Sequence, residues 1–138
     1  RVWLDRAHPW LVRATRGALV RTPPSVYAHC WRKSVEALRL FAPDAALCAV
    51  LPSVHRSAYY AGMHPHHERG MALTRALAAE LDVPLVDLAA ITARHLDGLN
   101  PDGIHWSWAQ HREVGEAMAR TLLPALRRRA ATPRPAEG

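Results

Sequence analysis

Apolar residues recur at helical spacing through most of the chain, and this pattern predicts five helices. Pro9 predicts a break in the first of them, and Ser25, which follows Thr22-Pro23-Pro24, is expected to cap the second. Pro124 is expected to kink the last helix or to end it early. The predicted helices cover residues 3–20, 25–41, 68–81, 88–95 and 107–128.

Two short apolar segments, 45–51 and 83–88, instead have the length and composition of buried strands. A helix separates them, so we expect a right-handed crossover that leaves the strands parallel. The predicted class is α/β, a three-layer α/β/α arrangement around a parallel sheet. Because two strands make a marginal sheet alone, we expect residues 1–129 to be part of one larger domain. Pairing with another subunit and a rearranged remnant of a larger fold are the alternatives. Residues 130–138 are expected to be a disordered tail.

Composition narrows the range of partners. Hydrophobic residues make up 49% of the chain, enough for a core, and the net charge of +6 favours anionic ligands. No zinc-finger spacing or basic-aromatic signature accompanies that charge, so we expect no nucleic-acid partner. No apolar run approaches the length of a membrane span, and Cys30 and Cys48 fit reduced core residues of a cytoplasmic protein.

The strongest chemical signal is Asp102 followed three residues later by His105, in the stretch Asn-Pro-Asp-Gly-Ile-His-Trp that precedes the last helix. A carboxylate that holds an imidazole in one tautomer makes it a base able to deprotonate a hydroxyl. Gly103 allows the tight bend between the two groups. The alternative is that Asp102 merely caps the helix, since aspartate is common at helix starts.

Residues 99–106, residues 110–112 and the segment 83–88 together resemble the C-terminal part of the SGNH (GDSL-type) hydrolase superfamily. In that family the Asp and His of D-x-x-H complete a catalytic triad, so the resemblance implies catalytic roles for Asp102 and His105. Residues 51–57, 59–65 and 100–106 resemble a narrower family, the diglucosylglycerate octanoyltransferases. That resemblance implies transfer of octanoyl to the glycerate of a glucosylglycerate, in the pathway to a methylglucose lipopolysaccharide.

The family's Gly-Asp-Ser block, which carries the nucleophile, has no match in this chain, and the Gly and Asn of its oxyanion hole are also unmatched. The serines are Ser25, Ser34, Ser53, Ser57 and Ser107, none in such a setting. Losing a triad nucleophile typically costs about a millionfold in rate, so we expect this chain alone to be inactive. The alternative function is a non-catalytic module that binds an acidic glycoside or a partner chain.

The loop after the first strand supplies further candidates, because open α/β sheets bind ligands beyond the carboxyl ends of their strands. We expect Ser53, His55, Arg56, Tyr59 and Trp106 to contact substrate, with Arg56 clamping a carboxylate. The alternatives are a solvated loop for 53–57 and ordinary packing for the aromatic residues. Asp87, at a strand end, is expected by default to bond a neighbouring loop.

The sequence predicts neither a metal site nor a tightly bound cofactor. The histidine-rich segment 64–68 matches no metal-binding spacing and is expected to be a surface loop before a helix, so no metal site is predicted. No tightly bound cofactor is expected. An acyl donor such as octanoyl-CoA and a glycoside acceptor are the expected partners, and a homo-oligomer is a further possibility.

Overall fold

The computed structural model describes residues 6–7, 10–11, 14, 22–57, 63, 65–98 and 100–131. The first predicted helix, 3–20, and the predicted tail, 130–138, therefore lie mostly outside the described residues. The elements in chain order are α2 (Pro24–Phe41), β1 (Ala49–Val50), α3 (His67–Glu80), β2 (Leu85–Val86), α4 (Leu88–Ala93), the 3-10 turn η1 (Leu96–Gly98) and α5 (Trp108–Ala131).

The two strands are parallel, as the sequence predicts, and pair Ala49 with Leu85 and Val50 with Val86. Both are far shorter than the predicted segments 45–51 and 83–88. The ladder is fixed by hydrogen bonds that include Ala49 N to Pro84 O, at 2.7 Å, and Leu51 N to Val86 O, at 3.0 Å. The apolar run predicted burial correctly at Ala49 and Leu51, but burial alone does not make a strand where no backbone partner lies alongside.

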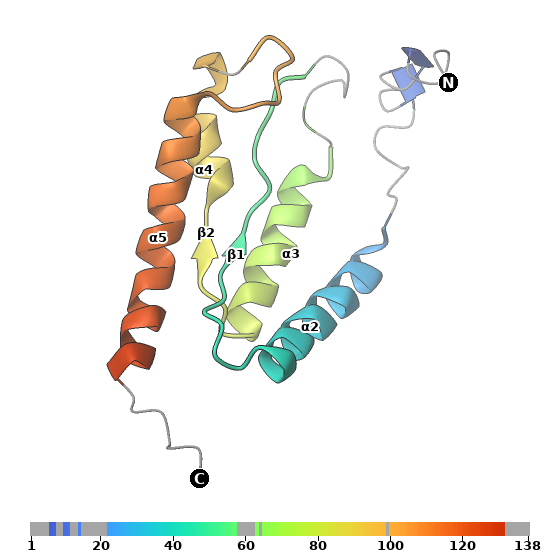
Figure 1. Ribbon diagram of the computed structural model, residues 1–138. Helices are drawn as coiled ribbons and strands as arrows, with labels where there is room; N and C mark the ends of the chain where they lie inside the picture. The colour runs from blue at the N-terminus through green and yellow to red at the C-terminus, as the bar shows by residue number, and fades with distance from the viewer. Residues whose placement is uncertain are drawn as a thin grey trace.

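Helices lie on both sides of this sheet, with α4 and α5 on one side and α2 and α3 on the other (Figure 1). Ala49 packs with Val35 of α2 and Ala78 of α3. Val86 packs instead with Val114 of α5. Successive residues of a strand point to opposite faces of the sheet. A short parallel sheet can therefore pack against two separate apolar clusters. The described chain is thus mixed α/β, with apolar clusters on two sides of its sheet, although Val50 of β1 stays 41% exposed.

Proline positions correct two sequence predictions. Pro23 occupies the N-cap of α2 without a side-chain hydrogen bond, and Pro24 begins the helix, so Ser25 is not the cap. Proline suits the first helical position because its fixed φ is helical and its missing N–H is unneeded there. Pro124 lies inside α5, which runs on to Ala131. Its exposed position lets water satisfy the carbonyl that the proline leaves unbonded, so the helix does not end early.

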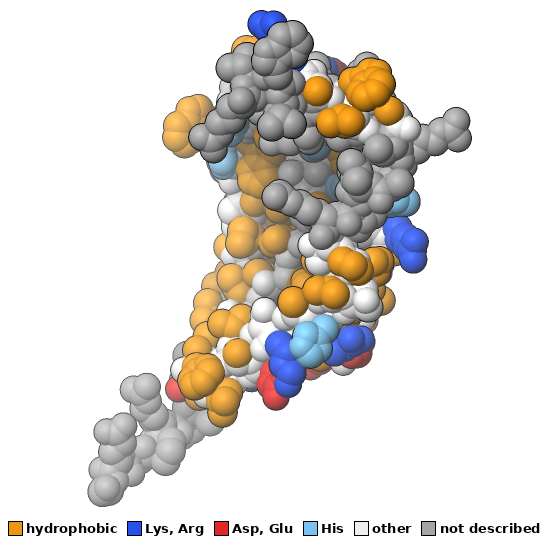
Figure 2. All heavy atoms as spheres, turned by 90° about the vertical axis from the view of Figure 1, so that its right-hand side faces the viewer, with side chains coloured by type: hydrophobic (Ala, Val, Ile, Leu, Met, Phe, Trp, Pro, Cys, Tyr) orange, Lys and Arg blue, Asp and Glu red, His pale blue; other side chains and the backbone are white. Residues whose placement is uncertain are grey.

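Helix α2 leaves several large apolar side chains uncovered, among them Leu38, Leu40 and Phe41, the last of these 83% exposed. Figure 2 shows hydrophobic side chains spread over the face of the molecule on this side, beside a cluster of charged ones. Within the described residues, no helix combines the length and apolar character that crossing a bilayer requires.

Both cysteines are free thiols, as expected, but only one of them touches the core. Cys48 is half-buried and packs against the cluster that contains Val86 and Val114. Cys30 is exposed, so its prediction as a core residue is wrong. The buried face of α2 carries Ala28 and Val35, which are seven residues apart, and Cys30 follows Ala28 by about 200° around the helix.

Candidate active site

The turn between η1 and α5 is closed by its own backbone. The Asn100 carbonyl accepts a hydrogen bond from Gly103 N at 2.8 Å, and Asn100 N donates to the His105 carbonyl at 3.1 Å. Pro101 restricts the second position of this turn. These bonds hold residues 100–105 as a compact loop at the entrance to α5, so the two polar side chains within it start from a fixed backbone.

Asp102 binds that loop and the imidazole at the same time. Its Oδ1 accepts hydrogen bonds from Ile104 N at 3.0 Å and His105 N at 3.1 Å, while Oδ2 contacts His105 Nδ1. The backbone N–H of Ile104, the His105 ring and the His105 N–H together lower the pKa of Asp102 to about 2. The carboxylate is therefore ionised at any pH at which the protein would work.

The His105 side chain is 75% exposed, and Asp102 is 44% exposed. With Nδ1 donating to the carboxylate, the neutral ring keeps its lone pair on Nε2. No contact within the described residues engages Nε2. The carboxylate and ring therefore face each other, and the ring is open to an approaching ligand. This arrangement is suited to general-base chemistry on a hydroxyl.

The loop that carries Asp102 and His105 packs against the segment that follows β1. Arg56 N donates to the Gly103 carbonyl at 3.0 Å. Gly103 has φ of +73°, and a Cβ there would lie 3.0 Å from both Arg56 C and Ser57 N. Glycine is required on both counts, since other residues rarely adopt this φ and a side chain would collide with backbone. In Figure 1 this junction lies at the end of the molecule to which the strands point.

The polar residues of the segment 53–57 differ in how exposed they are to solvent. Arg56 reaches Asp97 Oδ1 at 2.9 Å and is half exposed. Ser57 is 3% exposed, and its N–H donates to His55 Nδ1 at 3.4 Å. Ser53 and His55 are half-buried. Their substrate contacts stay predictions, and Tyr59 lies outside the described residues.

The two tryptophans beside the pair have different surroundings. Trp106 packs against the core cluster that includes Val86 and Val114, and its ring centroid lies 5.2 Å from that of His111. Trp108 is 89% exposed. The expectation that core packing accounts for one of them is confirmed for Trp106. A substrate contact by Trp106 stays a prediction.

Thr92 was not singled out in the sequence. It nevertheless joins α4 to the segment after β1, the segment whose Arg56 contacts the turn that carries Asp102 and His105. Its side chain is fully buried and donates to the Leu88 carbonyl at 2.7 Å. The same hydroxyl accepts a hydrogen bond from Val54 N at 2.9 Å. A threonine inside a short helix gives no sign of this role, because its partner lies 38 residues away.

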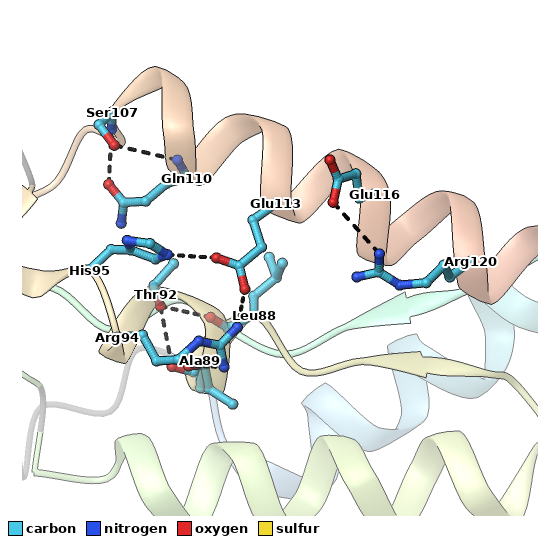
Figure 3. A network of polar contacts seen from close by, with 11 residues as sticks. Leu88, Ala89, Thr92, Arg94, His95, Ser107, Gln110, Glu113, Glu116 and Arg120 are labelled. Carbon is cyan, nitrogen blue, oxygen red and sulfur yellow. Dashed lines mark hydrogen bonds and ion pairs between the residues drawn. The ribbon is translucent and has the colours of Figure 1, made fainter.

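Glu113 of α5 forms a second link, shown in Figure 3. One carboxylate oxygen lies 2.5 Å from His95 Nε2, and the other contacts Arg94. These hydrogen bonds, from His95 first and then Arg94, lower the pKa of Glu113. Arg94 and His95 directly follow α4, so the carboxylate holds the end of α4 against α5 on the side from which the site loop departs.

Helix α5 begins with a reciprocal cap. Ser107 N donates to Gln110 Oε1 at 2.9 Å, and Gln110 N donates to Ser107 Oγ at 3.4 Å. Ser107 is therefore the N-cap of α5. The full S-x-x-Q pattern of a capping box was present and would also have identified Gln110. Gln110 is completely buried, with Nε2 unpartnered within the described residues.

Asp87 is also a capping residue. Its Oδ1 accepts a hydrogen bond from Ala90 N at 2.8 Å, and Oδ2 binds Arg75 at 2.7 Å. Partial burial works to raise the pKa of Asp87, but the hydrogen bonds from Ala90 and Arg75 outweigh it, and the pKa is lowered. The expected bond to a neighbouring loop is not what the structure shows, because the partners of Asp87 are Ala90 of α4 and Arg75 of α3.

No grouping of three or more His, Cys, Asp or Glu side chains suited to a metal ion occurs in the part of the chain that the structure describes. His66 occupies the N-cap of α3, without a side-chain cap, and His67 is its first residue. His64 lies outside the described residues. The expected helix start at this histidine-rich segment is thus confirmed, one residue earlier than predicted.

Comparison with known proteins finds two similar enzymes. The chain is 34% identical over 128 residues to the diglucosylglycerate octanoyltransferase of Mycobacterium tuberculosis, covering 91% of this chain and 52% of that protein. It is 35% identical over 125 residues to the enzyme of the same name from Mycolicibacterium hassiacum, covering 89% of this chain and 50% of that protein. The chain thus spans about half the length of the curated relatives it matches. No protein-family model and no solved structure matches it.

Proposed function

We propose that this chain supplies the general-base part of a serine-dependent acyltransferase, which moves an octanoyl group to the glycerate of a glucosylglycerate-type acceptor. The observation that carries the proposal is the exposed His105 ring, oriented through Nδ1 by an ionised Asp102. The names of the two similar enzymes support both the acyl group and the acceptor.

In this mechanism His105 Nε2 takes the proton from a serine hydroxyl as its oxygen attacks the acyl carbonyl. Asp102 stabilises the imidazolium that results, since it stays ionised. The leaving group departs with the proton from His105, which leaves an acyl-serine. His105 then deprotonates the acceptor hydroxyl, which attacks the ester and regenerates the serine. Water in place of the acceptor would give hydrolysis by the same steps.

The serine belongs, in this proposal, to a Gly-Asp-Ser block outside the present sequence, in an SGNH-type three-layer fold. Ser57, the serine closest to Gly103 along the segment after β1, is poorly placed to attack a substrate because the residue is only 3% exposed. Ser107 and Ser25 lie at or within helix starts. The two-stranded parallel sheet is compatible with such a fold.

Arg56 is the proposed ligand for the carboxylate of the acceptor's glycerate. Its backbone forms the seat of Gly103, so its side chain emerges close to the catalytic pair. The Asp97 carboxylate that it now binds is fully exposed. Exposed ion pairs typically contribute only about 0–1 kcal/mol, so a substrate carboxylate can replace Asp97 at little cost.

The test uses the full protein encoded by the gene that carries this sequence. A fluorophosphonate probe should label one serine, and octanoyl transfer to glucosylglycerate should be lost in His105→Ala. The matched control is His29→Ala, which removes an exposed histidine from α2. Equal transfer rates in the two variants would refute the base assignment.

A further outcome would favour the alternative function. If no serine is labelled and no transfer occurs, yet calorimetry detects glucosylglycerate binding that Arg56→Ala abolishes, the chain acts as a binding module for acidic glycosides. Arg56 is the residue to test for this alternative, because it is an exposed cation next to the loop that carries Asp102 and His105.

A further inference from the structure

A cavity of about 310 Å³ lies between the first turns of α2 and α3. Its walls are mainly apolar, and Pro24, Tyr27 and Leu73 contribute to them. The volume falls at the lower end of the range for small-molecule pockets, roughly 300–1,000 Å³. Most of the lining residues are exposed, so the cavity is open to solvent, and its mainly apolar wall suits an aliphatic chain better than a sugar, which needs many polar partners.

Two hydroxyl groups of the wall, those of Tyr27 and Thr74, are paired within the protein. Thr74 donates its hydroxyl proton to the Gly70 carbonyl at 2.9 Å. Its Oγ1 lies 2.9 Å from the Tyr27 hydroxyl, which therefore acts as the donor of that pair. These two hydroxyl protons are used internally. The other polar side chains of the wall are those of Thr22, His66 and Arg69, and most of the remaining wall is apolar.

Gly70 keeps the chamber open. A glycine inside a helix typically costs about 1 kcal/mol relative to alanine, so its presence in α3 is locally unfavourable. A Cβ at Gly70 would meet no atom within 4 Å, so packing does not require glycine there. Arg69, the preceding residue, is exposed at the rim of the same cavity. An apolar chamber with a cation at its edge matches an amphiphile with an anionic end.

The cavity is joined to the candidate active site through the segment that follows β1. Pro52 lines the cavity, and Arg56 and Ser57 of the same segment contact Gly103. In Figure 1 the first turn of α3 and the turn before α5 lie toward the same end of the molecule.

We propose that this cavity binds the aliphatic chain of a medium-chain fatty acyl group, with Arg69 attracting the negative charge at its head. The identity of the acyl group rests on the proposed function, whereas the existence of the site rests on the cavity itself.

The test measures binding of sodium octanoate to the chain by calorimetry, with butyrate as the shorter probe. Each methylene lost should weaken binding about fourfold, from the free energy of burying one CH₂. Gly70→Leu should fill the chamber and weaken octanoate binding at least tenfold. Gly115→Leu is the matched control, because Gly115 is an exposed helical glycine of α5 that also has open space around it.

Octanoate-induced NMR shifts at the methyl groups of Leu73 and Thr74 provide a second readout that needs no variant. Octanoate binding that Gly70→Leu leaves unchanged would overturn the proposal, as would shifts confined to other residues or no binding at millimolar ligand. Transfer activity does not enter this test. If the full protein binds octanoate at this cavity but transfers no octanoyl group, the proposed function fails and the proposed site stands.

Discussion

At the scale of single residues, Asp102 orients the imidazole but does not cap the last helix, which was the alternative, because Ser107 caps α5. Asp102 Oδ1 caps the turn through two backbone N–H groups, and its Oδ2 orients the His105 ring. The spacing D-x-x-H was sufficient to predict the pairing, because one turn of chain brings the two side chains together. The contact between Arg56 and Gly103 could not be predicted, because the two residues are nearly fifty positions apart in the sequence.

Asp102 should make stability depend on pH. Its folded pKa of about 2 lies below the ordinary value of 3.8, so its contribution is complete above about pH 4 and is lost as pH falls toward 2. Asp102→Asn should therefore destabilise the protein most at pH 5–6, with the difference from wild type vanishing near pH 2. Urea unfolding at several pH values measures this, with exposed Asp44→Asn as the charge control. A difference that stays constant with pH would contradict it.

Gly103→Ala should destabilise the fold by about 2 kcal/mol or more, since a left-handed φ costs non-glycine residues roughly 1–2 kcal/mol and the methyl also meets backbone. The relevant approach is 3.0 Å to Arg56 C and Ser57 N. Gly98→Ala is the control, with nothing within 4 Å of the new methyl, and should change stability by about 0.5 kcal/mol or less. Chemical unfolding of both variants gives the comparison, and equal effects would exclude the proposed seat.

At the scale of elements, helices were predicted better than strands. The starts and ends of α2, α3 and α5 fall within a few residues of the predictions, because helical periodicity and prolines are local signals. The strands were overestimated, since pairing needs a second backbone that a local pattern cannot reveal. Helix α4 was predicted, but its attachments through Thr92 and Glu113 depend on distant partners.

The Thr92 attachment predicts a specific loss. Thr92→Val keeps the shape but removes the acceptor for Val54 N–H, and an unsatisfied buried donor typically costs about 1–3 kcal/mol. Thr121→Val is the matched control, because that hydroxyl only donates to the Ala117 carbonyl within α5. Its effect should be below about 1 kcal/mol. Urea unfolding measures both, and hydrogen exchange at Val54 should accelerate only in Thr92→Val. Unchanged exchange there would contradict the assignment.

At the scale of the whole molecule, two apolar layers share one small sheet. Leu51, which follows β1, is completely buried and packs with Met71 of α3 and Ala89 of α4. It therefore joins elements from the two sides of the sheet that Figure 1 shows. The apolar run predicted that Leu51 is buried, but which helices meet on it follows from topology alone.

Leu51→Ala should cost about 2–5 kcal/mol, the usual range for a buried leucine. Leu40→Ala, at a residue 70% exposed, should change stability by about 0.5 kcal/mol or less. Because the sheet is common to both layers, unfolding of Leu51→Ala should remain one transition by tryptophan fluorescence and by circular dichroism. Two separate transitions would show that the layers unfold independently.

The main-chain contact between Gly103 and residues 56–57 bears on how specificity can change in such an enzyme. In the proposed enzyme, substitutions at Arg56 should change acceptor preference without moving the Gly103 turn, because the contact with Gly103 uses the main chain of Arg56 and Ser57. Directed evolution of new glycoside or alcohol acceptors should therefore accept wide variation at Arg56 and none at Gly103.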